Sequence, residues 1–204
     1  MSTPRYTYTT VNGVEVLTRE EWRLNGHFHR IDGPALREWQ VVDGERVLTR
    51  EEWYLDGRFH RIDGPAVREW QVVDGHEEAV LAFEAWYLND QHHRIDGPAW
   101  RQWQVVDGHG VLTLEMWYLK GKLHRTDGPA FREWQVIDGD VVLVHENWYL
   151  KNKEIHPRIL RQPVRAIERW WQFQRHQRQE AIEEELWDSG MTVFPGFMGL
   201  LREY

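Results

Sequence analysis

The residues of this chain that could do chemistry recur in one short element, His-Arg-x-Asp-Gly-Pro-Ala. The element occurs four times, with histidines His29, His60, His93 and His124 followed by arginines Arg30, Arg61, Arg94 and Arg125. A catalytic interpretation makes the histidine a base and the arginine an anion clamp. Because a catalytic site is normally built once, we favour a structural interpretation. In it, histidine packs on a tryptophan and arginine pairs with aspartate or stacks on a ring. A repeated binding groove for a small anionic ligand is the alternative.

Other kinds of chemistry find little support in the residue types. The chain has no cysteine, which excludes disulfides, thiolate metal sites and a cysteine nucleophile. Histidine recurs about every 31 residues without carboxylate or histidine partners at ligand spacing, so we expect no metal. Motifs of serine hydrolases, P-loop proteins and dinucleotide-binding proteins are absent. We therefore expect a protein that is not an enzyme and has no cofactor.

Length and charge narrow the class of protein further. The 204 residues are enough to bury a core, and the formal net charge of −8 argues against binding nucleic acid through its phosphates. No uninterrupted apolar run of about 18 residues exists, so we expect no membrane insertion. The polar stretch Met1–Thr10 lacks the core of a signal peptide. The sequence thus favours a cytoplasmic protein.

An internal repeat must position the recurring element. The segment from Trp53 to Trp70, WYLDGRFHRIDGPAVREW, recurs from Trp22, Trp86 and Trp117, and a half copy begins at Trp148. The first and second tryptophans of a unit are always 17 residues apart, and only the segment after Asp74-Gly75 changes length, by two residues. Such an insertion is expected in an exposed loop. The sequence predicts a repeat domain over residues 1–157, with four full units of about 31 residues and a half unit at each end.

Each unit has the pattern of β structure. Asp56-Gly57 and Asp43-Gly44 separate apolar segments and predict tight hairpin turns, the second placing Trp39 opposite Leu48. Asp63-Gly64-Pro65 is expected to bend or bulge a long strand. The sequence therefore predicts a mostly β solenoid of stacked antiparallel β-hairpins, with two long strands per unit.

Two points of this interpretation stay open in the sequence. The segment LTREEW before Trp53 also fits a capping box, from Thr49 to Glu52, and a short helical turn is the alternative to a strand there. The tryptophans form two columns at repeat spacing, which are expected to be the core of the stack. A concave groove of tryptophan and arginine that binds a ligand is the alternative.

The motif W-x-x-[ND]-G followed by H-R-x-D-G-P-A resembles the variant MORN repeats of phage, giant-virus and bacterial proteins, some of which carry an antitoxin-like description. The standard unit is shorter and starts with Tyr-Glu-Gly, where this chain has Trp53-Tyr54-Leu55. The resemblance covers residues 8–157. It implies a hairpin-stack fold that serves as a scaffold or as a binding surface for proteins and sometimes lipids. It brings no catalytic residue.

The C-terminal segment, residues 158–204, breaks the repeat. Pro163 suits the first turn of a helix, and the composition from Val164 to about Asp188 predicts one, with Trp170 and Trp171 in its apolar stripe. Such a helix would cap the last hairpin, form a dimer contact or dock on a partner. The tail Met191–Leu201 is apolar enough to require docking somewhere.

Together these patterns predict a non-catalytic binding protein, either an adaptor, an inhibitor or an assembly component. It would act through a repeat face and the C-terminal helix on a protein partner. One alternative is a protein that sequesters a small molecule or nucleotide in arginine–tryptophan grooves. A second is a homo-oligomeric structural protein, such as a phage particle component. The candidate binding residues are the four histidines and four arginines of the repeated element together with Trp170 and Trp171.

Overall fold

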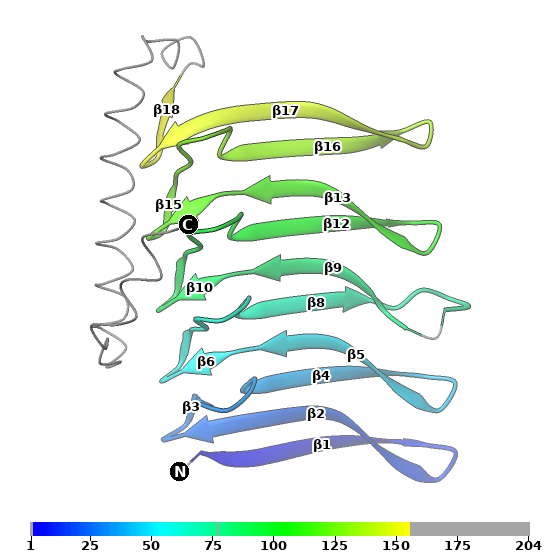
Figure 1. Cartoon of the computed structure of the whole chain (residues 1–204). Helices are drawn as coiled ribbons and strands as arrows, with labels where there is room; N and C mark the ends of the chain where they lie inside the picture. The colour runs from blue at the N-terminus through cyan, green and yellow to red at the C-terminus, as the bar shows by residue number, and fades with distance from the viewer. Residues whose placement is uncertain (1, 77, 156–204) are drawn as a thin grey trace, which may run out of the picture. The chain divides into compact units, whose positions relative to one another are not determined.

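Two kinds of antiparallel β-hairpin, long and short, alternate along the chain (Figure 1). The computed structural model describes residues 2–76 and 78–155, which are mostly β and contain no helix. The long strands are β1 (Thr3–Val11), β2 (Val14–Leu24), β4 (Leu36–Val42), β5 (Glu45–Glu52), β8 (Val67–Gln71), β9 (Val80–Ala85), β12 (Trp100–Val106), β13 (His109–Met116), β16 (Phe131–Ile137) and β17 (Asp140–Leu150). The short strands are β3 (His27–Phe28), β6 (Tyr54–Leu55), β7 (Arg58–Phe59), β10 (Tyr87–Leu88), β11 (Gln91–His92), β14 (Tyr118–Leu119), β15 (Lys122–Leu123) and β18 (Lys153–Ile155).

Two-residue turns close the hairpins as the sequence predicts. Asp43 and Gly44 both have positive φ, 51° and 86°, which suits the primed turns that match the twist of the flanking strands. Glycine reaches this region without strain and aspartate tolerates it. The register that follows from this turn places Trp39 opposite Leu48, which confirms the predicted pairing.

The repeated element separates the two kinds of hairpin instead of bending one long strand. Residues 60–66 belong to no strand and lie between the short hairpin β6–β7 and the long strand β8. Each unit therefore contains a short hairpin followed by a long hairpin. The sequence instead predicts two continuous long strands that run through both. The prediction was wrong on this point because glycine and proline end the pairing here and do not merely distort it.

A β-bulge interrupts every long hairpin at the same place. In β4–β5, Trp39 pairs with Leu48 but Glu38 pairs with Arg50, so Thr49 is the extra residue. The Thr49 hydroxyl donates a hydrogen bond to the carbonyl of Glu38 at 3.2 Å, which satisfies a backbone group at the irregularity. The segment that also fitted a capping box is thus a strand with a bulge.

The long hairpins join into one open sheet in the order β1-β2-β4-β5-β8-β9-β12-β13-β16-β17-β18. Neighbouring hairpins pair through only three residues each, such as Arg50–Glu52 of β5 with Val67–Glu69 of β8. The Gly-Pro-Ala segment also connects neighbouring hairpins, because the N–H of Trp53 donates a hydrogen bond to the carbonyl of Ala66 at 2.7 Å. Ala66 has no exposed surface, so a larger side chain does not fit there.

The two-residue insertion falls between β8 and β9, where residues 74–76 are exposed. The predicted C-terminal segment, residues 158–204, lies outside the described residues. The same holds for its candidate binding residues Trp170 and Trp171.

Candidate functional site

The arginine of the repeated element lies against the tryptophan that begins its own unit. The Cζ atom of Arg61 is 3.9 Å from the centroid of the Trp53 ring. Gly64 leaves the space that the guanidinium occupies, because a Cβ at this position would lie only 2.8 Å from Arg61 Cζ. The arrangement repeats for Arg30, Arg94 and Arg125, with ring distances of 4.2, 3.9 and 3.9 Å. A cation over an aromatic face that is partly shielded from water is a favourable contact.

Hydrogen bonds occupy the same guanidinium groups. Arg61 donates from Nε to Asp63 at 2.9 Å and from one terminal nitrogen to the Pro65 carbonyl at 3.4 Å. The hydrogen bond from Arg61 lowers the pKa of the Asp63 carboxyl. These contacts are the ones expected from the structural interpretation of the element. Each guanidinium is thus held by residues of its own unit.

The histidines of the element connect each unit to the next one. The Nδ1 atom of His29 accepts a hydrogen bond from the Asp56 N–H at 3.1 Å, and His124 accepts one from the Lys151 N–H at 3.3 Å. His60 Nδ1 lies 2.9 Å from Asn89 Oδ1 in the corresponding turn. The histidine therefore holds the turn of the following short hairpin, a contact that the sequence interpretation, with histidine on tryptophan, did not anticipate.

One face of the long sheet carries an alternating ladder of glutamate and arginine, which we call the charged face. Residues directly opposite each other on neighbouring strands share a face. The ladder consists of Glu20, Arg37, Glu51, Arg68, Glu84, Arg101, Glu115, Arg132 and Glu146, each opposite the next. These residue types are the same in every unit. The charged face is thus a property of the repeat itself.

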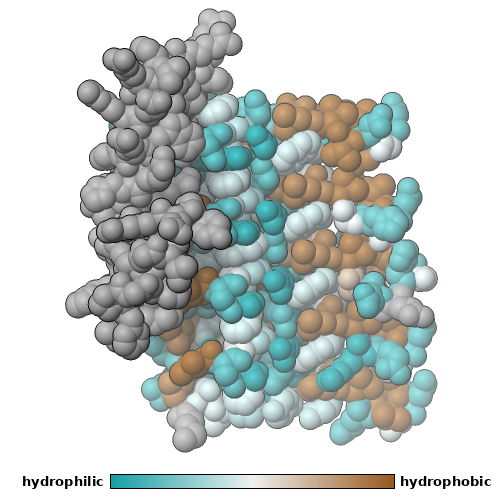
Figure 2. Space-filling view, in the orientation of Figure 1, coloured by the Kyte–Doolittle hydropathy of each residue, from teal (hydrophilic) through white to brown (hydrophobic). Residues whose placement is uncertain are grey.

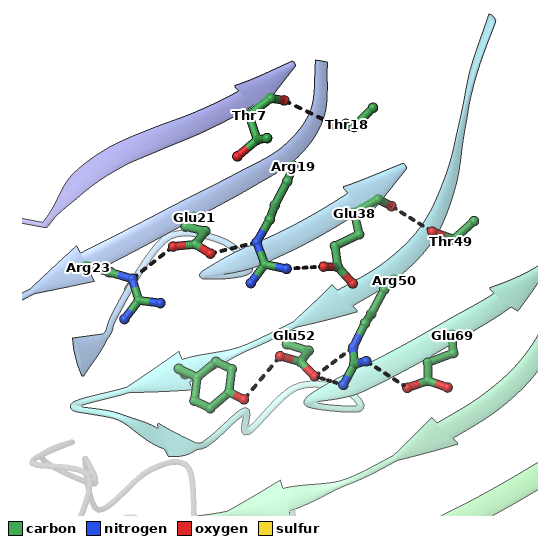
Figure 3. A network of polar contacts seen from close by, with 11 residues as sticks. Thr7, Thr18, Arg19, Glu21, Arg23, Glu38, Thr49, Arg50, Glu52 and Glu69 are labelled. Carbon is green, nitrogen blue, oxygen red and sulfur yellow. Dashed lines mark hydrogen bonds and ion pairs between the residues drawn. The ribbon is translucent and has the colours of Figure 1, made fainter. Parts of the chain in front are cut away.

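The opposite face changes from unit to unit, and we call it the variable face. In the first units it bears ion pairs, with Arg19 between Glu21 and Glu38 and with Arg50 between Glu52 and Glu69 (Figure 3). The Tyr54 hydroxyl donates to Glu52 at 3.1 Å, and burial together with this carboxylate raises the pKa of that tyrosine.

In β9 and β13 the positions equivalent to Arg50 and Glu52 are apolar. Arg50 and Glu52 of β5 correspond to Phe83 and Ala85 of β9 and to Leu114 and Met116 of β13. We define the apolar patch as Phe83, Trp100, Leu114, Met116 and Phe131, which are partly exposed. The rings of Phe83 and Trp100 meet edge to face with centroids 4.6 Å apart. Aromatic and methionine side chains in such a cluster are typical of protein interfaces.

A row of stacked rings along the short hairpins adjoins the patch. Centroids of neighbouring rings are 4.1–5.1 Å apart, and the row consists of Phe28, Tyr54, Phe59, Tyr87, His92 and Tyr118. His92 also meets Trp100 of the patch at 5.2 Å. Burial lowers the pKa of His92 below its ordinary value of 6.5.

We expect His92→Phe to stabilise the protein in mild acid. The pKa of His92 is lower in the folded than in the unfolded state. The contribution of the neutral His92 side chain to the stability of the fold is therefore fully present above pH 6.5, and it is lost as the pH falls through the pKa of the folded state. Phenylalanine already occupies the equivalent positions Phe28 and Phe59. The gain in stability relative to the parent chain should therefore be larger at pH 5 than at pH 7.5. Urea unfolding at pH 5 and pH 7.5 measures this, and equal gains at both pH values would contradict it. The exposed His109→Phe is the control.

Figure 2 shows how hydropathy is distributed over one face of the long hairpins. Hydrophilic residues gather over the half nearer the short hairpins, and hydrophobic residues over the half nearer the turns of the long hairpins.

Within residues 2–76 and 78–155, no three histidine, aspartate or glutamate side chains converge so that they could hold a metal ion. The same part of the chain contains no helical segment with the length and hydropathy of a membrane span.

Comparison with known proteins finds no matching family model, no similar curated protein and no similar solved structure. The resemblance to variant MORN repeats therefore stays a prediction from the sequence.

The apolar patch is the feature that motif reasoning missed. Its signal is present in the sequence as a difference between units, since Arg-x-Glu before Trp22 and Trp53 becomes Phe-x-Ala before Trp86 and Leu-x-Met before Trp117. The residues that recur in every unit are instead the ones that stabilise the units and connect them.

Proposed function

We propose that the chain is a non-catalytic binding protein of the MORN-like hairpin-stack type, which recognises a protein partner through the apolar patch of the variable face. The observation that carries this proposal is the contrast between the two faces. Glutamate and arginine recur across all units on the charged face, whereas the patch replaces the ion pairs of the first units with aromatic, leucine and methionine side chains. Repeat folds commonly place binding residues at positions that vary among otherwise similar units.

The chemistry of the patch suits a protein partner better than a small anion. Aromatic and methionine side chains are enriched in protein interfaces, where a few buried residues carry much of the binding energy inside a polar rim. Here Glu69 lies opposite Phe83 and Glu133 opposite Leu114, and these glutamates form part of the rim. The arginines of the repeated element, by contrast, are engaged with their own aspartates and tryptophans. We propose the adaptor or inhibitor role on this basis.

A double variant tests the patch by giving two of its positions the residue types that another unit has there; we call this variant the swap. Leu114→Arg combined with Met116→Glu gives the third unit the residue types that Arg50 and Glu52 provide in β5. We expect the full-length tagged protein to capture a stoichiometric partner from its native cells. The swap should weaken this binding about 30-fold or more, as the loss of a central contact does.

Two further variants make the result decisive. Ile31→Lys changes an exposed apolar residue, 81 % accessible, that lies outside the patch, and it should bind like the parent chain. A truncation after Pro157 asks whether the C-terminal segment is also required. A partner that binds the swap and the parent equally well would refute the role of the patch. If the truncation loses the partner and the swap keeps it, the C-terminal segment and not the patch binds the partner.

A further inference from the structure

A groove opens beside the apolar patch, between the first strands of neighbouring long hairpins. It has a volume of about 620 Å³ and is formed by parts of β12 and β16 with contributions from β8 and β13. The glutamine and threonine side chains of its lining are Gln71, Gln102, Gln104, Thr113 and Gln135. No residue that lines the groove is charged, although charged residues make up 28% of the chain. The lining therefore suits a neutral group that forms hydrogen bonds.

Unpaired strand edges accompany the groove. β13 and β16 pair only through Leu114–Met116 and Phe131–Glu133, and beyond that joint Trp134–Ile137 pairs with β17 alone. Likewise β12 pairs with β9 only over Trp100–Gln102. In an antiparallel pair every second residue directs its N–H and C=O away from its partner strand. The segments of β12 and β16 near the turns thus each have one edge with free main-chain donors and acceptors.

The glutamines at the groove are not needed for the internal contacts of the fold. Gln71, Gln104 and Gln135 occupy equivalent positions in successive units, and all three are exposed. Among the described residues their side chains make no hydrogen bond. Each amide offers two donor hydrogens and an acceptor oxygen, the same groups that a peptide backbone presents.

From these observations we propose that the groove binds an extended polypeptide segment, which adds as a strand to the free edge of β12 or β16 and contacts the glutamine amides. Strand addition supplies affinity through main-chain hydrogen bonds, and alternate side chains of the bound segment supply specificity. The inference rests on the proposed function in taking the ligand to be a protein. It adds that recognition uses an extended, uncharged segment whose apolar side chains reach the adjoining patch.

Peptide selection tests the groove directly. The full chain is immobilised and probed with a phage-displayed library of random 12-residue peptides, and the enriched peptides are synthesised. We expect enriched sequences to be uncharged and free of proline at their centre, because proline removes a main-chain donor. Methylating alternate backbone nitrogens of an enriched peptide should lower its affinity at least tenfold for one set of nitrogens and little for the other. Recognition through side chains alone would not distinguish the two sets.

Matched variants locate the binding. Gln104→Lys and Gln135→Lys place a charge in the groove and should each weaken peptide binding at least tenfold. Gln40→Lys makes the same change at an equivalent exposed position outside the groove and should have no effect. Failure to enrich any peptide, or binding that ignores both groove variants, would overturn the inference. The proposed function would survive either result if the cellular partner still depends on the patch. If instead peptides bind the groove but no partner depends on the patch, only the proposed function falls.

Discussion

Replacing Arg94 by alanine is expected to lower the free energy of unfolding by about 3 kcal/mol, and Gly97→Ala by about 2 kcal/mol. Arg94 lies 3.9 Å from the Trp86 ring and donates to Asp96 at 2.9 Å. A Cβ on Gly97 would lie 2.8 Å from Arg94 Cζ, so the guanidinium must leave this position. The glycine is thus required because of the arginine and not because of its own backbone conformation.

The double variant separates this explanation from a general intolerance of alanine. With Arg94 already removed, Gly97→Ala has nothing to displace, and it should cost nothing or stabilise by about 0.5 kcal/mol through the unfolded state. The two single effects should therefore fail to add by about 2 kcal/mol in a double-mutant cycle followed by urea unfolding. Additive effects would show that the glycine has another role.

Glu115→Ala is expected to lower the free energy of unfolding by about 2 kcal/mol. The Glu115 side chain is 12 % exposed, and its carboxylate lies 3.3 Å from Arg132 and 4.0 Å from Arg125. Its removal takes one carboxylate from each of these partly buried guanidinium groups, so that Arg132 keeps only the longer contact to Glu146 and Arg125 keeps Asp127. A break in the charged face between the third and fourth units should also make unfolding less cooperative, because repeat folds depend on contacts between neighbours.

Glu146→Ala is the control for this prediction. Glu146 continues the same ladder at the last long hairpin, but its side chain is 44 % exposed and lies 3.8 Å from Arg132. Exposed ion pairs contribute little, so the cost should stay below about 1 kcal/mol. Equal losses for the two variants, measured by tryptophan fluorescence in urea, would contradict the role of burial in the charged face.

Much of the local structure follows from short stretches of sequence. The pair Asp43-Gly44 predicts a turn and, through it, the register that sets Trp39 opposite Leu48. The constant spacing of the tryptophans predicts the repeat. These features are local because a two-residue turn admits few backbone conformations and determines its neighbours' pairing.

Other features depend on contacts between residues that are distant in sequence. Thr49 fits both a strand and a capping box, and the cross-strand carbonyl of Glu38 decides between them. His29 reaches the turn at Asp56, 27 residues away, and nothing within its own unit indicates this partner.

The sequence by itself determined the repeat, its hairpin turns and the predominance of β structure. Only the tertiary structure showed that the repeated arginine and histidine stabilise the units. It also showed that the differences between units gather on one face as the apolar patch. The physical reason is that a strand directs alternate side chains to opposite faces. Which residues of separate units become neighbours there depends on how the hairpins pair, bulges included.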